Sequence, residues 1–419
     1  MKIYKETINN TDVIFLKTNK YKTNSIKIAF KGEFNKENAS YRILLNRILK
    51  EGCSKYKTKK EALLERYKMY AASFKVSSNI QYKMNITSFS CSFIKKGPIK
   101  ADLTSDVINY MKEFILYPNI ENSKFNQKVF DEAKRLEIEK IISRYDNKEI
   151  YALDSIIDLM GKDTLLSVKP YGSLETVEAI SSESLYQFYL EMFKTEEISI
   201  FITGDYTFKK VQKIVQEIGI YNKVKLNVPF EIENEIKVIE NQKVVEKKNF
   251  EQSILMRGYR VQNINFNDKD KYAALSFLLI YGSGPFSKLF EVVREKNSLV
   301  YDIDVNIDFS YHIMLVYAGL ASVNTSKARK LIEAELEKIK KGNISKEALN
   351  KAKHCLLSQL NSLSDNISRI RMFYEMQYFL NDNNSIKEKI KIIKDIKKED
   401  VVRIANNIVF DSEFLLEGK

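Results

Sequence analysis

The sequence predicts an α+β fold of two homologous domains, each a mainly antiparallel sheet packed against helices, in the form of a half-clamshell. Three observations lead to this prediction. The same order of expected strands and helices is written twice along the 419 residues. Two pairs of segments resemble each other across the halves. The helical patterns cluster instead of alternating strictly with strands, which argues against a doubly wound parallel sheet.

The first half mixes strand and helix signals. Thr58 and Glu61 have the spacing of a capping box, which marks the start of a helix. Apolar residues recur at helical spacing further on, at Phe130, Ala133, Leu136 and Ile141. The elements expected here are strands at 13–16 and 26–30, helices at 41–50 and from Thr58, strand-forming stretches within 74–93, and helices at 105–114 and 130–143.

The second half repeats this order of elements. Ser345 is a suitable cap for the helix that follows it. The elements expected here are a strand at 253–261, helices at 268–280 and 286–296, strands at 299–308 and 313–320, and an amphipathic helix at 326–341.

Matching segments support a duplication with about 200 residues in each copy. Residues 119–140 resemble residues 343–360, and residues 181–205 resemble residues 397–418. We therefore expect an N-terminal domain at 1–220 and a C-terminal domain at 249–419. The charged stretch 221–248, which contains Pro229 and no glycine, is the expected linker.

The composition describes a globular chain with an excess of positive charge. Lysine and arginine number 68 against 55 aspartate and glutamate residues, which gives a net charge of +13. The lysines are spread along the chain and no nucleic-acid-binding module is recognisable, so we expect no nucleic-acid partner. Solvated lysine-rich faces explain the excess, and an electropositive surface for acidic partners or peptides is the alternative.

We expect a cytoplasmic protein that makes no contact with a membrane. Residues 1–15 lack the apolar core of a signal peptide. The most apolar stretches, such as 273–281, are too short to cross a bilayer. Cys53, Cys91 and Cys355 are too few and too scattered for a disulfide framework or a cysteine metal site.

Several segments resemble ligand-binding motifs but lack the residues or the spacing that such motifs require. The segment GSGPFS at 282–287 lacks the third glycine and the lysine of a phosphate loop. The two histidines, His312 and His354, lie too far apart in the sequence to predict a zinc site.

The alternating polar residues from 302 to 308 do not predict a calcium loop. Ile307 and Ile313 stand where such a loop needs glycine and glutamate. The alternation instead predicts the polar face of a strand whose other face carries Tyr301, Ile303, Val305 and Ile307.

Arg294 and Tyr301 become candidates because of the residues around them. Alone, an arginine near a helix end meets the helix dipole favourably, and a tyrosine on an apolar strand face usually belongs to the core. The segment SKLFEVVREKNSLVY at 287–301 resembles the C-terminal signature of the insulinase/pitrilysin superfamily of zinc metallopeptidases, especially its processing peptidase-like branch. The resemblance covers nearly the whole chain. It extends to the bacterial YfmF-like proteins, which resemble non-zinc subunits of a zinc-bearing paralogue.

The resemblance also implies where a metal site has been lost. In that superfamily a helix reads His-x-x-Glu-His, and two histidines with a distant glutamate hold zinc while the first glutamate is the general base. The matching stretch here is ILLNRILKEGCSKY at 43–56, and it places Ile43, Asn46 and Arg47 at the His, Glu and His positions.

The resemblance places the distant glutamate near Lys140, with Glu137 and Glu139 close by. Every expected ligand is replaced, and a guanidinium repels a dication. We therefore expect no metal or other cofactor in this chain and expect zinc in a partner subunit.

The function that this resemblance implies is shared between two chains. Arg294 would bind the substrate backbone near the cleaved bond. The Tyr301 hydroxyl would polarise the scissile carbonyl, where the loss of one donor typically costs about a hundredfold in rate. We predict the non-zinc subunit of a heterodimeric bacterial metalloendopeptidase, inactive alone, that hydrolyses short or unstructured peptides together with a homologous zinc-bearing chain. A catalytically inert scaffold and a peptide-binding subunit, acting in peptide maturation or elongation factor P modification, are the alternatives.

Overall fold

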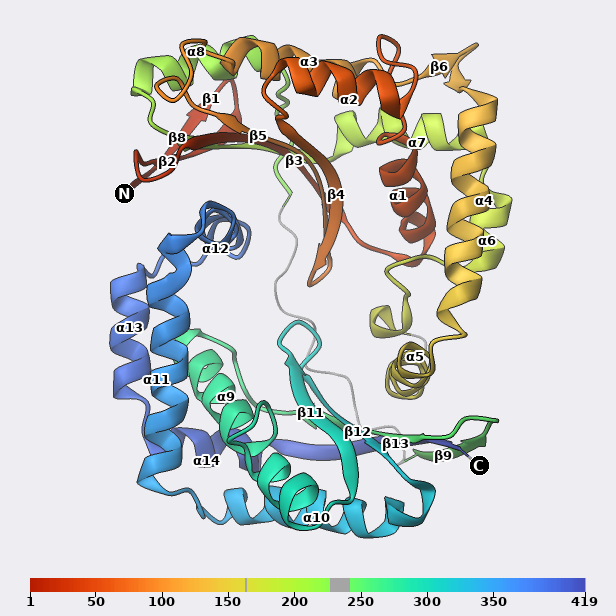
Figure 1. Ribbon diagram of the computed structural model, residues 1–419, viewed down its shortest axis with the longest axis vertical. Coiled ribbons are helices and arrows are strands. Elements are labelled where there is room, and N and C mark those ends of the chain that lie inside the picture. The colour runs from red at the N-terminus through yellow and green to blue at the C-terminus, as the bar shows by residue number, and fades with distance from the viewer. Residues whose placement is uncertain (163, 227–241, 419) are drawn as a thin grey trace. The chain divides into compact units, whose positions relative to one another are not determined.

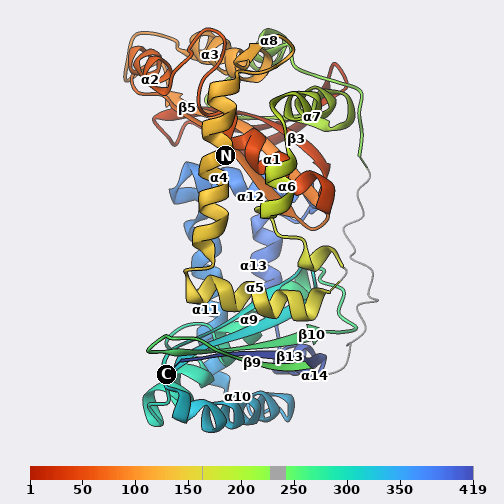
Figure 2. The ribbon, with the colours of Figure 1, turned by 90° about the vertical axis from the view of Figure 1, so that its right-hand side faces the viewer.

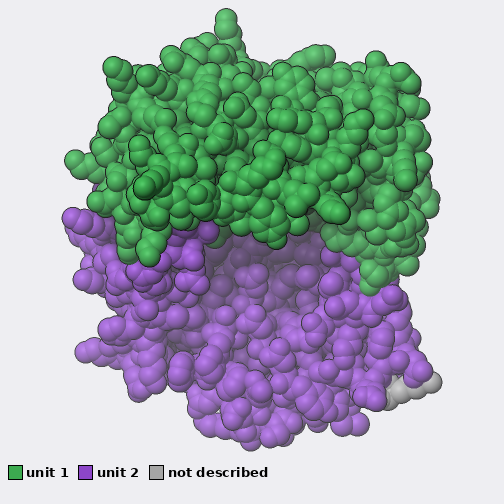
Figure 3. Space-filling model, turned by 45° about the horizontal axis from the view of Figure 1, so that its top comes forward, with its two compact units in different colours: residues 1–143, 168–230, 371–376 green, residues 144–167, 231–370, 377–419 purple. Residues whose placement is uncertain are grey.

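The computed structural model describes residues 1–162, 164–226 and 242–418 (Figure 1). Part of the expected linker, residues 227–241, lies outside the described residues. The chain forms two compact units, each with one large sheet and its own helices, which confirms the predicted α+β fold of two homologous parts. Unit 1 comprises residues 1–143, 168–230 and 371–376, and unit 2 comprises residues 144–167, 231–370 and 377–419 (Figure 3).

Unit 1 contains a six-stranded sheet with the strand order β1-β2-β8-β3-β5-β4. Its neighbouring strands are antiparallel except for the parallel pair of β2 and β8. All eight residues of β8 are buried, as expected for a strand inside a sheet. The strands are β1 (Lys2–Ile8), β2 (Thr11–Lys17), β3 (Thr23–Glu33), β4 (Ser73–Gln81), β5 (Met84–Ile94) and β8 (Glu197–Gly204), with a small hairpin of β6 (Ile120–Glu121) and β7 (Lys124–Phe125).

The helices of unit 1 share one apolar core with its sheet. Leu44 of the first helix, Val107 and Val211 are completely buried in this core with Ile28 and Phe89 of the strands. The predicted cap at Thr58 is present, since its hydroxyl accepts the Glu61 backbone N–H at 3.2 Å. The helices are α1 (Lys36–Ile48), α2 (Lys59–Lys68), α3 (Thr104–Leu116), α4 (Gln127–Arg144), α6 (Leu174–Ala179), α7 (Ser182–Thr195) and α8 (Phe208–Ile218).

Unit 2 contains a five-stranded sheet with the order β11-β12-β10-β13-β9. Only β13 and β9 pair in parallel among its described strands. The strands are β9 (Gln242–Lys247), β10 (Ser253–Val261), β11 (Val300–Asp308), β12 (Ile313–Leu320) and β13 (Ile408–Glu417). The helices are α5 (Lys148–Gly161), α9 (Asp268–Tyr281), η2 (Phe290–Lys296), α10 (Thr325–Lys340), α11 (Lys346–Ser362), α13 (Ile386–Asp395) and α14 (Lys398–Asn406), with short 3₁₀ turns η1 (Leu165–Ser167), η3 (Ser322–Asn324) and η4 (Leu363–Asp365).

The two sheets have the same topology. The order β2-β8-β3-β5-β4 in unit 1 corresponds strand by strand to β9-β13-β10-β12-β11 in unit 2, with the parallel pair at the same place, and β1 is an addition. The segment matches seen in the sequence fall on corresponding elements, α4 with α11 and α7-β8 with α14-β13. The predicted duplication is therefore reproduced in three dimensions. Within the described parts of the chain, no helix combines the length and the apolar character that a bilayer crossing requires.

Each unit contains one helical segment whose neighbours in the sequence belong mainly to the other unit. α5 follows α4 in the sequence, yet it packs on the sheet of unit 2, along β10 and β13 (Figure 2). Residues 371–376, in the middle of α12 (Ile367–Phe379), belong to unit 1, where Glu375 forms an ion pair of 2.7 Å with Lys27 of β3. Because α5 and α12 hold the same place in the two halves, the exchange is reciprocal.

The place of α5 on its sheet is fixed by one glycine and one arginine. Gly258 of β10 leaves room for Met160, because a Cβ at residue 258 would overlap the Met160 sulfur. Arg260, on the same face of β10, donates to the Met160 carbonyl oxygen and to the Asp411 carboxylate of β13, the latter at 2.7 Å. The end of α5 is thus held by a close packing contact and by a buried cation.

Gly258→Ala is expected to lower the free energy of unfolding by roughly 1–3 kcal/mol, because the added methyl group overpacks the contact with Met160. In a Met160→Ala background the same substitution should cost less, since the space is then free. Denaturant unfolding of the four combinations measures this coupling. An equal cost of Gly258→Ala in both backgrounds would contradict the proposed packing of α5.

Candidate functional site

Arg294 lies on a π-helix, η2, where the sequence predicted an ordinary helix. Its guanidinium stacks over the Phe290 ring at 4.7 Å and approaches the Glu295 carboxylate at 4.0 Å, and 40% of its side chain is exposed. The Asn297 side chain donates to the Val292 carbonyl oxygen at 2.9 Å and closes the end of this helix. A π-helix is rare in proteins, and it occurs frequently at functional sites.

Tyr301 lies at a β-bulge, and this corrects the predicted face of the strand. Val300 pairs with Leu320 and Asp302 pairs with the adjacent Gly319, so Tyr301 is the extra residue. The sequence pattern placed Tyr301 on the apolar face of β11 with Ile303, Val305 and Ile307, which are buried. That placement is wrong for Tyr301, which is 64% exposed, because the bulge turns its side chain to the other side.

The backbone between Arg294 and Tyr301 contains a further irregularity. Ser298 has a φ of 49°, in the left-handed region that non-glycine residues rarely adopt. Within residues 290–301 the chain therefore combines a π-helix, a left-handed serine and a bulge. Such unfavourable conformations persist where the surrounding structure enforces them, and they concentrate at functional sites.

The structure beneath this segment is closely packed. Leu289 and Val293 of the helical segment are completely buried. Gly282, at the end of α9, packs against Val305 of β11 so closely that a Cβ there would overlap the valine side chain. The Asn324 side chain donates to the Leu299 carbonyl oxygen at 3.2 Å. The half-exposed Arg294 and the exposed Tyr301 thus lie on a firmly packed support, as a binding site requires.

The three positions of the expected metal-binding helix lie on α1 of unit 1. Ile43, Asn46 and Arg47 are all partly buried. The Arg47 Nε donates to the Glu137 Oε1 of α4 at 2.5 Å, with 24% of the arginine side chain and 6% of the glutamate side chain exposed. Lys140, where the resemblance placed the distant glutamate, is exposed to solvent. The carboxylate that reaches α1 therefore belongs to Glu137.

Sequence reasoning missed the position of Glu137, although a signal was present. The buried residues of α4 are Phe130, Ala133, Glu137 and Ile141. Leu136, which the apolar pattern included, is only partly buried. A glutamate on a buried stripe needs a partner, because an uncompensated buried charge is strongly unfavourable. That requirement points to a cation on the facing helix, and Arg47 supplies it.

The residues of α1 and α4 do not fit zinc. A guanidinium offers only donors and cannot be deprotonated in a protein, so Arg47 can neither ligate a cation nor leave Glu137 free to do so. Ile43 has no ligand atom. Over the described residues, no cluster of three or more His, Cys, Asp or Glu side chains could hold a metal ion.

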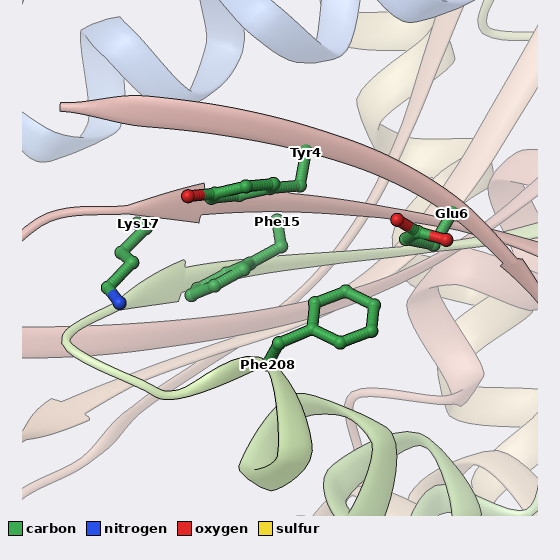
Figure 4. A pocket seen from close by; sticks show the side chains of 5 residues that line it. All are labelled: Tyr4, Glu6, Phe15, Lys17 and Phe208. Carbon is green, nitrogen blue, oxygen red and sulfur yellow. The ribbon is translucent and has the colours of Figure 1, made fainter.

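A small cavity in unit 1 is lined by none of these residues. It has a volume of about 220 Å³ and lies between the hairpin of β1 and β2 and the start of α8 (Figure 4). It is lined by Tyr4, Glu6, Phe15, Lys17 and Phe208, and the rings of Tyr4 and Phe15 stack at 5.8 Å. This volume lies below the roughly 300–1,000 Å³ of typical small-molecule sites, and we assign it no ligand.

Comparison with known proteins adds evidence that is independent of this geometry. A family model described as the peptidase M16 inactive domain matches residues 179–356. A Bacillus subtilis (strain 168) protein, the probable inactive metalloprotease YmfF, is 24% identical over 409 residues, which cover 96% of this chain and 95% of that protein.

Two crystal structures show the same fold over the whole chain. A conserved protein from Enterococcus faecalis V583 has a TM-score of 0.90 at 21% identity, over 100% of this chain and 99% of that one. The peptidase M16 inactive domain from Pseudomonas fluorescens has a TM-score of 0.81 at 13% identity, over 100% of this chain and 99% of that one.

Removal of Arg47 is expected to destabilise unit 1. Arg47→Met leaves the Glu137 carboxylate buried without its cation, and we expect a loss of about 2 kcal/mol of unfolding free energy, less than for a fully buried pair because Arg47 is partly exposed. The added change Glu137→Gln should recover much of this loss. Urea unfolding of the single and double variants measures both values, and additive losses would show that the two side chains are not coupled.

Rebuilding the His-x-x-Glu-His motif on α1 should create a zinc site. The triple variant Ile43→His, Asn46→Glu, Arg47→His is expected to bind Zn²⁺, since Glu137 then completes a set of two histidines and one glutamate. Titration with Zn²⁺ followed by thermal unfolding detects binding as a rise in Tm. Further addition of Glu137→Gln should abolish this rise. If the rise instead requires Lys140→Glu, the assignment of Glu137 is wrong.

Proposed function

We propose that this chain, a homologue of the inactive M16 metallopeptidases, is the non-zinc subunit of a two-chain peptidase. A homologous zinc-bearing chain would contribute the metal and the general base. This chain would contribute Arg294 and Tyr301. The reaction would be hydrolysis of a peptide bond in short or unstructured peptides, and neither this chain alone nor two copies of it would catalyse it.

One contrast between the two units carries the proposal. In unit 1 the ion pair of Arg47 and Glu137 lies where the resemblance implies a metal site, and among the described residues no cluster of metal-ligating side chains is present. In unit 2 the signature residues Arg294 and Tyr301 are exposed on a backbone that is unfavourable in three places. A purely structural tyrosine would be expected in the core, and a purely structural segment has no reason to keep such a conformation.

The chemistry of the two side chains suits the stabilisation of a transition state. A tyrosine hydroxyl is a neutral donor, and it acts best when aimed at the oxygen that becomes negative as water attacks a carbonyl. A guanidinium offers several donors in a fixed plane and can hold a peptide carbonyl next to the reacting bond. Placed on a helix and an adjoining strand, the two groups would position the substrate and stabilise its developing charge.

The substrate form follows from the sheet edges. β4 is an edge strand of the sheet in unit 1, and β11, which carries Tyr301, is an edge strand in unit 2. An extended peptide can add to such an edge through main-chain hydrogen bonds, while alternate side chains provide selectivity. Folded proteins do not present a free strand, so unstructured peptides are the substrates that this mode accepts.

We also propose a cytoplasmic location. Cys53 and Cys91 are buried free thiols and Cys355 is an exposed free thiol. Free thiols that are not organised into a disulfide framework are typical of a reducing compartment.

Substitutions at the two signature residues should separate rate from binding. In a mixture with a zinc-bearing homologue, Tyr301→Phe is expected to lower kcat by about a hundredfold, because one oxyanion donor is lost. Arg294→Ala is expected mainly to raise KM, because it removes a contact to the bound peptide. Cleavage of an unstructured fluorogenic peptide measures both parameters.

Exposed residues of the same types provide matched controls. Tyr67→Phe on α2 and Arg135→Ala on α4 change side chains that are 60% and 53% exposed, and both should leave cleavage unchanged. If the mixture cleaves equally well with Tyr301→Phe and Arg294→Ala, the two residues are not catalytic. In that case the inert scaffold replaces the shared active site as the function.

A further inference from the structure

The helix α2 of unit 1 presents its larger apolar residues to solvent. It is held to the core by Ala62 and Met69, which are buried, and the Tyr110 hydroxyl of α3 donates to the Ala62 carbonyl oxygen at 3.2 Å. Its leucine and tyrosine side chains are between 40% and 60% exposed, as is the tyrosine that follows the helix. These four residues, here called the α2 face, are Leu63, Leu64, Tyr67 and Tyr70.

The α2 face reverses the usual arrangement of a surface helix. In most surface helices the large apolar residues face the core. Here the small Ala62 packs inward, while Leu64 and Tyr67 point away from the core at the periphery of unit 1 (Figure 2). Because residues three and four apart share one side of a helix, Leu63 and Leu64 adjoin Tyr67 in a continuous stripe. Such a contiguous exposed apolar group marks an interaction surface.

The backbone directly after α2 is unfavourable. Tyr70 and Ala71 have φ angles of 55° and 56°, in the left-handed region that glycine adopts more easily than any other residue. The Tyr70 side chain is exposed, so burial of its ring does not offset this conformation. Unfavourable backbone conformations concentrate at functional sites, and this one lies beside the exposed stripe in the sequence.

Basic residues border the α2 face. Residues 55–70 contain six lysine and arginine residues against two glutamates. Lys57 and Lys60 are exposed, and neither has an ion-pair partner among the residues that the structure describes. Lys59 and Lys68 are exposed as well, although each forms an ion pair of 2.8 Å with a glutamate. The apolar stripe therefore lies within a surface of net positive charge.

The charge and the position of Lys60 indicate the kind of partner. A second copy of this chain would place lysines against lysines, which is unfavourable. Lys60 shares the side of the helix that carries Leu64 and Tyr67, so a protein that covered the stripe would bury its ammonium group and need a carboxylate opposite it. At a membrane surface a lysine instead buries its methylene groups and keeps its ammonium among the headgroups. A tyrosine, with an apolar ring and a polar hydroxyl, suits the same boundary.

We propose that the α2 face binds the surface of a membrane that contains anionic lipids. The leucine and tyrosine side chains would enter the boundary between headgroups and acyl chains, while Lys57 and Lys60 would contact the lipid phosphates. The cytoplasmic leaflet of a membrane carries the negative surface potential that attracts such lysines, which agrees with the proposed cytoplasmic location. The expectation of no membrane contact considered only segments that cross a bilayer, whereas α2 would lie on its surface.

Sedimentation of the whole chain with lipid vesicles tests the proposal. One set of vesicles contains phosphatidylcholine alone, and the other contains equal parts of phosphatidylcholine and phosphatidylglycerol. The chain is expected to bind the anionic vesicles at least roughly tenfold more tightly, because each lysine near a negative membrane surface contributes about fivefold. This preference should weaken as salt is added, since the lysines are exposed to solvent.

Two double variants separate the charged and the apolar contributions. Lys57→Gln with Lys60→Gln should weaken binding to the anionic vesicles by roughly tenfold or more, because two lysines are lost. Leu64→Ser with Tyr67→Ser should also weaken it by roughly tenfold, because the apolar area that enters the bilayer is lost.

Matched control variants change the same types of side chain at exposed positions elsewhere. Lys327→Gln with Lys330→Gln lies on α10, and Leu174→Ser with Tyr221→Ser lies in unit 1. Both pairs should leave vesicle binding unchanged. Thermal unfolding of every variant confirms that it is folded, which the exposure of all these side chains favours.

The absence of tryptophan from the sequence allows a direct optical measurement. Tyr67→Trp places a single indole on the α2 face, and its fluorescence should shift to shorter wavelength when anionic vesicles are added, because the ring enters the membrane boundary. Tyr221→Trp, at another exposed position of unit 1, should show no such shift.

The outcomes are distinct from those of the cleavage experiment. Equal binding to the two kinds of vesicle, no binding to either, or an equal loss in the control variants would overturn the proposal. A dimer that Leu64→Ser with Tyr67→Ser abolishes, in a chain that binds no vesicles, would assign the α2 face to a second copy instead. Peptide cleavage by the two-chain mixture would still support the proposed function in each of these cases, and vesicle binding without any cleavage would support this inference alone.

Discussion

The ion pair between Arg47 of α1 and Glu137 of α4 joins two helices of unit 1 through a largely buried carboxylate. A glutamate on the buried face of α4 requires a cation on α1, and either a metal ion or a guanidinium meets that requirement. Here the guanidinium does, at 2.5 Å, so the two helices are joined without a metal ion between them. Because an arginine stays protonated at every physiological pH, no change of conditions restores a metal site. Under the proposed function, hydrolysis would therefore depend on a second chain.

The two units share one sheet topology but differ in the residues at their candidate sites. Their sheets share one topology, and the short helix α2 of unit 1 corresponds in order to the π-helix η2 of unit 2. Unit 1 has the ion pair of Arg47 and Glu137 at the position where the resemblance implies a metal site. Unit 2 keeps an unfavourable backbone that holds Arg294 and Tyr301 outward, and the buried Leu289 and Val293 beneath it stabilise that conformation. The proposed division of labour between two chains would account for both halves of this contrast.

Local patterns were sufficient for much of the fold but not for the site. The strands at 253–261 and 313–320 and the cap at Ser345 are where alternation and capping chemistry placed them. The bulge at Tyr301 and the π-helix are backbone irregularities that no local pattern of residues encodes. The exchange of α5 was also invisible, because an amphipathic helix does not specify which sheet it covers. The partner of Glu137 could be found only once α1 and α4 were placed together.

The most direct test is a titration. A fixed amount of a zinc-bearing homologue is mixed with increasing amounts of this chain, and the rate of peptide cleavage is recorded. A shared active site predicts a rate that rises from near zero and levels off when the two chains are equimolar, with this chain alone showing no activity. A rate that is already full without this chain, and does not change as it is added, would contradict the division of labour.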